Sequence, residues 1–89
     1  MKIVHIYETQ DDGSQTIGCT VRLVGKEVRF MGKYGKYYKE DLVDNGIYTP
    51  VGKRGKMLYP KDGLKFMKAL KMQYTGSAVR ASDVMTVPD

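Results

Sequence analysis

The sequence predicts one small α+β domain, in which an antiparallel sheet of about four strands is covered by two helices. Apolar and polar residues alternate along the first third of the chain, whereas a later segment repeats its apolar residues with the period of a helix. The chain has 89 residues, enough for one core and no second domain. We therefore expect a single domain over 1–89, a two-layer fold with the order βββα, a loop, then αβ.

The first three predicted strands form an antiparallel meander. Residues 2–8 alternate with a period of two and are rich in β-branched side chains, which predicts a strand. Residues 10–14 read Gln-Asp-Asp-Gly-Ser, a combination typical of a turn. Further strands are expected over 16–24 and 27–31, and the two residues between them indicate a β-hairpin.

A helix is predicted over 36–45, because Tyr34, Tyr38 and Leu42 recur every four residues and an Asn-Gly pair follows as a stop signal. This spacing favours inward packing of both tyrosines with Leu42. The next stretch, 47–56, contains Pro and two Gly without a sustained period, and it is expected to be a mobile loop.

A second helix is predicted over 60–73. Pro60 suits the first helical position, and Asp62 adds a favourable negative charge to the first turn. On a helical wheel one face gathers Gly63, Phe66, Met67, Leu70 and Tyr74, and the opposite face gathers Lys61, Lys65 and Lys68. After Gly76 the alternating, β-branched stretch 77–87 predicts a closing strand.

Positive charge is concentrated in the centre of the chain. Residues 22–71 hold thirteen Lys or Arg against five Asp or Glu, a net charge of +8, whereas the remainder has a net charge of −3. This asymmetry is compatible with an anionic partner, although it also occurs on ordinary soluble proteins.

Within this basic centre, lysines and tyrosines alternate in a way that suits nucleic acid, because cations attract phosphates and flat rings stack on unpaired bases. The candidate nucleic-acid-binding residues are Lys33, Tyr34, Lys36, Tyr37, Lys39, Lys53, Arg54 and Lys56. The structural alternative is that the tyrosines belong to the core and the lysines form a solvated face. No RRM, KH, zinc-knuckle or helix-turn-helix signature accompanies them.

No constellation of catalytic or metal-binding residues is recognisable. The five Gly-Lys pairs lack the upstream Gly and the following Ser or Thr of a P-loop, so they are interpreted as turn glycines beside lysines. His5 and Cys19 are single and lie within predicted strands, where a core or edge histidine and a buried thiol are the favoured interpretations. We expect no enzymatic activity, no metal and no cofactor.

The expected location is the cytoplasm. The first residues lack the apolar region of a signal peptide, and no apolar run approaches the length of a membrane span. The single Cys19 excludes an internal disulfide and fits a reducing compartment.

The segments YPKDGLKFMKAL (59–70) and YTGSAVRAS (74–82) resemble short uncharacterised bacterial proteins. These proteins share Pro-x-Asp-Gly-x-x-Phe-x-x-Ala-Leu followed by Gly-Ser-x-x-Arg-Ala. The matching positions are Pro60, Asp62, Gly63, Phe66, Ala69, Leu70, Gly76, Ser77, Arg80 and Ala81. The resemblance implies no activity. Most of these positions are explained by a helix, a turn and a strand, but Arg80 either pairs with an acid or lies on a binding surface.

The sequence thus favours a non-catalytic interaction module whose partner is an unknown protein or a second copy of the chain. The alternative is a nucleic-acid-binding protein that uses the basic, tyrosine-rich centre. A third possibility is action on an anionic metabolite, which requires a pocket where the Gly-Lys turns and Arg80 converge.

Overall fold

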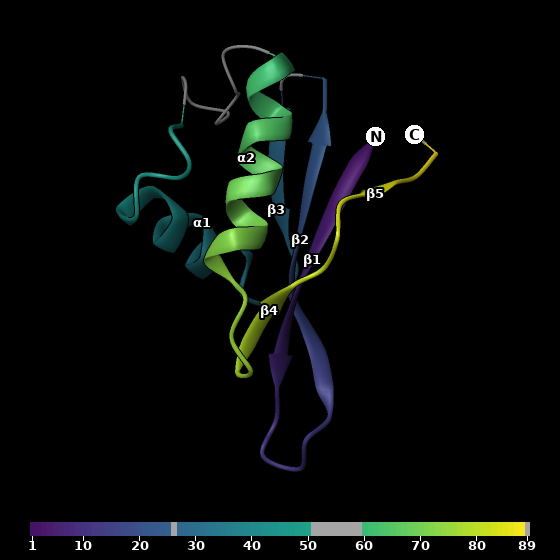
Figure 1. Cartoon of the computed structure of the whole chain (residues 1–89), viewed down its shortest axis with the longest axis vertical. Coiled ribbons are helices and arrows are strands. Elements are labelled where there is room, and N and C mark those ends of the chain that lie inside the picture. Colours follow the sequence, from purple (N-terminus) through teal and green to yellow (C-terminus); the bar gives the residue numbers. More distant parts are fainter. Residues whose placement is uncertain (26, 51–59, 89) are drawn as a thin grey trace.

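The chain forms an antiparallel sheet with two helices over one of its faces (Figure 1). The computed structural model describes residues 1–25, 27–50 and 60–88. Its elements are β1 (Lys2–Thr9), β2 (Gln15–Val24), β3 (Glu27–Met31), α1 (Gly35–Asp44), α2 (Pro60–Gln73), β4 (Val79–Ala81) and β5 (Met85–Thr86). The predicted α+β class is confirmed, and the elements follow the predicted order except that two short strands replace the single closing strand.

β1 lies inside the sheet, with β2 along one edge and both β4 and β5 along the other. The path of strands is β3-β2-β1-β4, and β5 pairs with the first residues of β1. The two ends of the chain meet here, because the amino group of Met1 donates to the Val87 carbonyl (2.8 Å) and the Val87 N–H donates to the Met1 carbonyl (2.9 Å). In Figure 1 both termini lie at the same end of the sheet.

The prediction of a single closing strand over 77–87 is wrong, because the strand is interrupted after Ala81 and only β4 and β5 form. The His5 N–H donates to the Ser82 hydroxyl (2.9 Å), and the Ser82 N–H donates to the His5 carbonyl (2.8 Å). A side-chain oxygen therefore replaces a main-chain carbonyl in the ladder. The chain continues antiparallel to β1, but it does so as two short strands.

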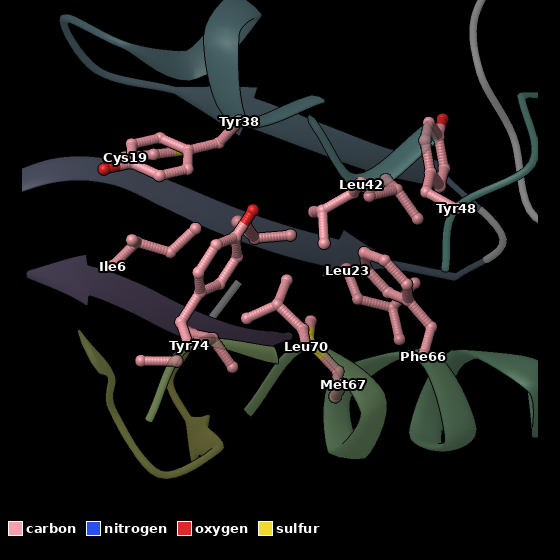
Figure 2. Packing of buried hydrophobic residues seen from close by; sticks show 14 residues of the cluster. Ile6, Cys19, Leu23, Tyr38, Leu42, Tyr48, Phe66, Met67, Leu70 and Tyr74 are labelled. Atoms are coloured by element: carbon pink, nitrogen blue, oxygen red, sulfur yellow. The ribbon is translucent and has the colours of Figure 1, made fainter. Parts of the chain in front are cut away.

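The core fills the space between the sheet and the helices (Figure 2). The sheet contributes Val4, Ile6, Cys19, Val21, Leu23, Val28 and Ala81; the helices and adjoining segments contribute Tyr38, Leu42, Tyr48, Phe66, Met67, Leu70 and Tyr74. Even-numbered residues of β1 thus face the helices. Its odd-numbered residues face the other way.

A β-bulge in β2 adapts the sheet to the chain segment that follows β3. Ile6 pairs with Cys19 whereas Tyr7 pairs with Ile17, so Gly18 has no partner in this register. A Cβ atom at Gly18 would lie 2.8 Å from the Glu8 carboxyl carbon. The Gly18 carbonyl accepts the Tyr34 N–H (2.9 Å). The missing side chain therefore leaves room for the Glu8 carboxyl group, and the Gly18 carbonyl links β2 to the start of α1.

Both helices were predicted closely, α2 with the observed bounds and α1 shifted by one residue. The predicted apolar face of α2 is buried, and Lys65 and Lys68 are exposed. No helix in the described ranges is long and apolar enough to cross a membrane.

The predicted mobile loop over 47–56 is only partly described, since 51–56 lie outside the described residues. Tyr48 is 2% exposed, with its ring centroid 5.1 Å from that of Phe30 and 5.6 Å from that of Phe66. The start of this segment therefore belongs to the core, because its aromatic side chain fills the space between β3 and α2.

Replacement of Leu70 tests the packing of α2. Leu70 is fully buried, whereas Met72 on the same helix is 78% exposed. We expect Leu70→Ala to lower the free energy of unfolding by about 2–5 kcal/mol, because it removes buried methyl groups and leaves a cavity. Met72→Ala is the matched control and should change it by less than about 0.5 kcal/mol. Urea denaturation followed by circular dichroism measures both, and equal effects would contradict this packing.

Candidate functional site

The face of the sheet opposite the helices is covered by no described helix or strand, and we call it the open face. Cross-strand pairs share a face, and the register places on it Ile3, His5, Tyr7, Ile17, Thr20, Arg22, Arg29, Met31 and Arg80. Ile17 and Met31 are 47% and 44% exposed. The open face therefore combines aromatic, apolar and cationic side chains on a continuous sheet.

Two rings lie along the middle of the open face. His5 and Tyr7 follow each other on β1 with ring centroids 6.0 Å apart and planes at 64°. A ring nitrogen of His5, Nδ1, lies 2.8 Å from the Thr20 hydroxyl. His5 is half-buried on an internal strand and lies outside the core cluster, so the predicted core or edge position is wrong.

Three arginines share the open face with these rings. The Arg22 guanidinium donates to the thioether sulfurs of Met1 (3.1 and 3.3 Å) and Met31 (3.3 Å), which are weak acceptors. Arg29 forms an exposed ion pair of 2.5 Å with Glu27. Arg80 is exposed and lies directly opposite Tyr7 in the neighbouring strand. The cations are thus spread over three strands.

The sequence-predicted residues at the start of α1 occupy a different surface. Lys33 and Lys36 are exposed, Lys39 is half-buried, and Tyr34 and Tyr37 are 41% and 62% exposed. The predicted inward packing of Tyr34 is wrong, because this residue precedes the helix as its N-cap. Tyr38 and Leu42 are buried as predicted. Lys53, Arg54 and Lys56 lie outside the described residues.

A cleft opens beside the exposed tyrosines, on the helix side of the sheet. It has a volume of about 340 Å³ and is lined by Glu8, Tyr34, Tyr37, Tyr38, Asp41, Tyr74 and Val79. We call it the tyrosine cleft. The Tyr38 ring packs edge-to-face on Tyr37 (5.1 Å) and on Tyr74 (5.5 Å). Four aromatic rings from α1, its N-cap and the residue that follows α2 therefore surround one space.

Each buried tyrosine of the cleft donates its hydroxyl to a carboxylate. Tyr38 donates to Glu8 Oε2, and Tyr74 donates to Asp41 Oδ2 at 2.7 Å. Burial, and next the hydrogen bond to Glu8, raise the pKa of Tyr38 above its ordinary value. Burial and the hydrogen bond to Asp41 likewise raise the pKa of Tyr74. The hydroxyl groups remain protonated donors that orient the two carboxylates.

A polar groove of about 910 Å³ runs beside β4 and includes Tyr7, Lys71, Arg80 and Asp83 among its lining residues. Lys71 pairs with Asp83, and Lys71 and to a smaller extent Arg80 lower the pKa of that carboxyl. The glycines and lysines of the described Gly-Lys turns at 32–33 and 35–36 do not line this groove. The convergence that an anionic-metabolite site requires is thus not found for these two turns.

The described residues contain no group of three or more His, Cys, Asp or Glu that could hold a metal ion. Cys19 is fully buried, and burial raises the pKa of its thiol to about 11. A protonated, inaccessible thiol is a poor nucleophile, so Cys19 serves packing.

Sequence reasoning missed both the open face and the tyrosine cleft. The alternation of Ile3, His5 and Tyr7 in β1 was a visible signal for a ring-bearing face. The placement of Arg22 and Arg80 beside them depends on the strand register. Arg80 also lies on a different surface from Lys33 and Lys36, so the basic residues do not form one patch.

No family model, no curated protein and no solved structure matches this chain. The resemblance of 59–70 and 74–82 to short bacterial proteins therefore stays a prediction.

The buried tyrosines make stability sensitive to alkaline pH. Their pKa values are raised in the folded protein, so their contribution to stability is present below about pH 10, the unfolded value, and is lost as the pH rises through the folded values. We expect the phenolate absorbance of Tyr38 and Tyr74 to appear only together with unfolding. Tyr74→Phe should remove part of this late absorbance. Complete ionisation near pH 10 with an unchanged circular dichroism spectrum would contradict this assignment.

Proposed function

We propose that this protein is a non-catalytic interaction module that binds single-stranded nucleic acid on its open face. The observation that carries the proposal is the pair of rings, His5 and Tyr7, in the middle of a sheet whose neighbouring strands present Arg22 and Arg80. Unpaired bases stack on such rings, and arginines meet the phosphates between them.

The geometry of β1 suits successive bases. Side chains two residues apart on a strand point to the same face and lie about 6.6–6.8 Å apart. His5 and Tyr7 are two residues apart on β1, with ring centroids 6.0 Å apart, and the paired strands on both sides hold β1 in place. A duplex offers no free base surface to these rings. We therefore propose a preference for single strands.

The charges of the open face support an anionic ligand. Arg22 donates to thioether sulfurs, which are weak acceptors, and a phosphate oxygen is a much stronger acceptor for a guanidinium. Arg80, which lies beside Tyr7, is exposed and able to reach a phosphate. Phosphate binding by both arginines would position a single-stranded nucleic acid across β1.

The surface at the start of α1 is the second candidate for the same ligand. Lys33 and Lys36 are exposed there beside the accessible rings of Tyr34 and Tyr37. Lys53, Arg54 and Lys56 remain predicted contributors to that surface. A protein partner or a second copy of the chain is the remaining alternative, since Ile17 and Met31 add apolar area to the open face. We propose the cytoplasm as the location, on the ground of the single reduced thiol.

Fluorescence anisotropy of labelled single-stranded and duplex oligonucleotides tests the proposal. We expect tighter binding of single strands, and an affinity that falls steeply as salt rises from about 50 to 200 mM, because phosphate contacts release counterions. Tyr7→Ala should weaken binding about ten-fold through lost stacking, whereas Tyr37→Ala, a matched ring on the α1 surface, should not.

Arg80→Ala and Lys68→Ala provide a second matched pair, because each removes one exposed positive charge and Lys68 lies on the outer face of α2. Only Arg80→Ala should weaken binding clearly. Loss of binding in Tyr37→Ala but not in Tyr7→Ala would move the site to the α1 surface. Absence of binding at low salt, together with a dimer in light scattering, would favour a second copy as the partner.

A further inference from the structure

We propose that the tyrosine cleft is a binding site for a substituted ammonium group, such as a quaternary amine. The site lies on the helix side of the sheet and is separate from the open face. The proposal therefore does not depend on nucleic-acid binding. It rests on the aromatic walls of the cleft, its negative charge and the hydrogen bonds that hold its two carboxylates.

The walls of the cleft are aromatic. Tyr38 and Tyr74 are 2% and 7% exposed and form its inner part, whereas Tyr34 and Tyr37 are open to solvent. Tyrosine faces attract cations through the negative potential of the ring. The Tyr34 ring already forms such a cation–π contact within the chain, since the Lys33 ammonium lies 5.4 Å from its centre. Tyr37 and Tyr38 meet at nearly right angles (84°), an arrangement that aromatic pairs favour and that holds the two rings in place.

The charge of the cleft is negative. Glu8 and Asp41 are the charged groups among its lining residues. Neither carboxylate forms an ion pair with any Lys, Arg or His of the described chain. A pair of partly buried carboxylates next to apolar rings lacks a compensating charge, and a bound cation would supply it.

The carboxylates are held in place while part of their acceptor capacity stays open. Glu8 uses Oε2 for the Tyr38 hydroxyl, and Asp41 uses Oδ2 for the Tyr74 hydroxyl. The second oxygen of Asp41 has only a long contact of 3.4 Å with the Asn45 amide. Each carboxylate therefore keeps one oxygen that no short hydrogen bond within the described residues occupies.

These features select the class of ligand. An anion would be repelled by two carboxylates, and a neutral apolar molecule would gain nothing from them. Ca²⁺ or Mg²⁺ lacks the oxygen cage it requires, because four of the seven lining residues are tyrosines that present aromatic rings. An alkylated ammonium combines diffuse positive charge with apolar surface. It matches both the rings and the carboxylates.

Choline and its uncharged isostere 3,3-dimethylbutan-1-ol test the proposal on the full chain. Isothermal titration calorimetry should show that choline binds at least about ten-fold more tightly than the isostere, which has the same shape but no charge. Tyr37→Ala should lower choline affinity about ten-fold, and this exposed residue can be replaced without loss of the core. Tyr7→Ala, a ring on the open face, should leave it unchanged.

Glu8→Gln and Asp44→Asn separate local charge from net charge. Both remove one carboxylate, but Asp44 does not line the cleft. We expect weaker choline binding only in Glu8→Gln, provided that circular dichroism shows a folded variant; Tyr37→Ala decides if it does not. Equal affinity for choline and the isostere, no binding of choline, or equal effects of Tyr37→Ala and Tyr7→Ala would overturn the proposal.

Discussion

The rest of the structure depends on the pairing of β1 along both of its edges. β2 lies on one side and the segment from β4 to β5 on the other, so the main-chain groups of β1 are used inside the sheet. Its side chains must then alternate between two environments. Val4 and Ile6 enter the core, while His5 and Tyr7 remain on the open face. One strand thereby supplies both apolar residues of the core under the helices and the two rings of the open face.

On the face of the sheet that the helices cover, buried tyrosines also orient two carboxylates. Tyr38 and Tyr74 contribute rings to the core, and their hydroxyl groups reach Glu8 and Asp41 at its border. The absence of a side chain at Gly18 makes the Glu8 contact possible, because a Cβ atom there would collide with the Glu8 carboxyl group. Glu8 belongs to β1 and Asp41 to α1, so the cleft lies where the sheet meets α1. The positions of the two carboxylates in the cleft are therefore set by the packing of the buried tyrosines.

Much of the fold could be predicted because its signals are local. The apolar period of α2 and the Pro60 start signal gave its bounds, and alternation gave β1, β2 and β3 to within one residue. The break after Ala81 could not be predicted, since it arises from a bond between Ser82 and His5, 77 positions apart in the sequence. The pair Tyr38–Glu8 is likewise 30 positions apart. The exposure of Tyr37 could be anticipated, but its position beside two carboxylates required the register of the strands.

The central claim is that the two faces of β1 carry two different binding chemistries. Two-dimensional NMR of the ¹⁵N-labelled chain, titrated with a single-stranded oligonucleotide and separately with choline, tests it most directly. The oligonucleotide should shift the signals of Tyr7, Arg22 and Arg80, and choline those of Glu8, Tyr37 and Asp41, with little overlap beyond sequence neighbours. Perturbation of one common set of residues by both ligands would contradict the account.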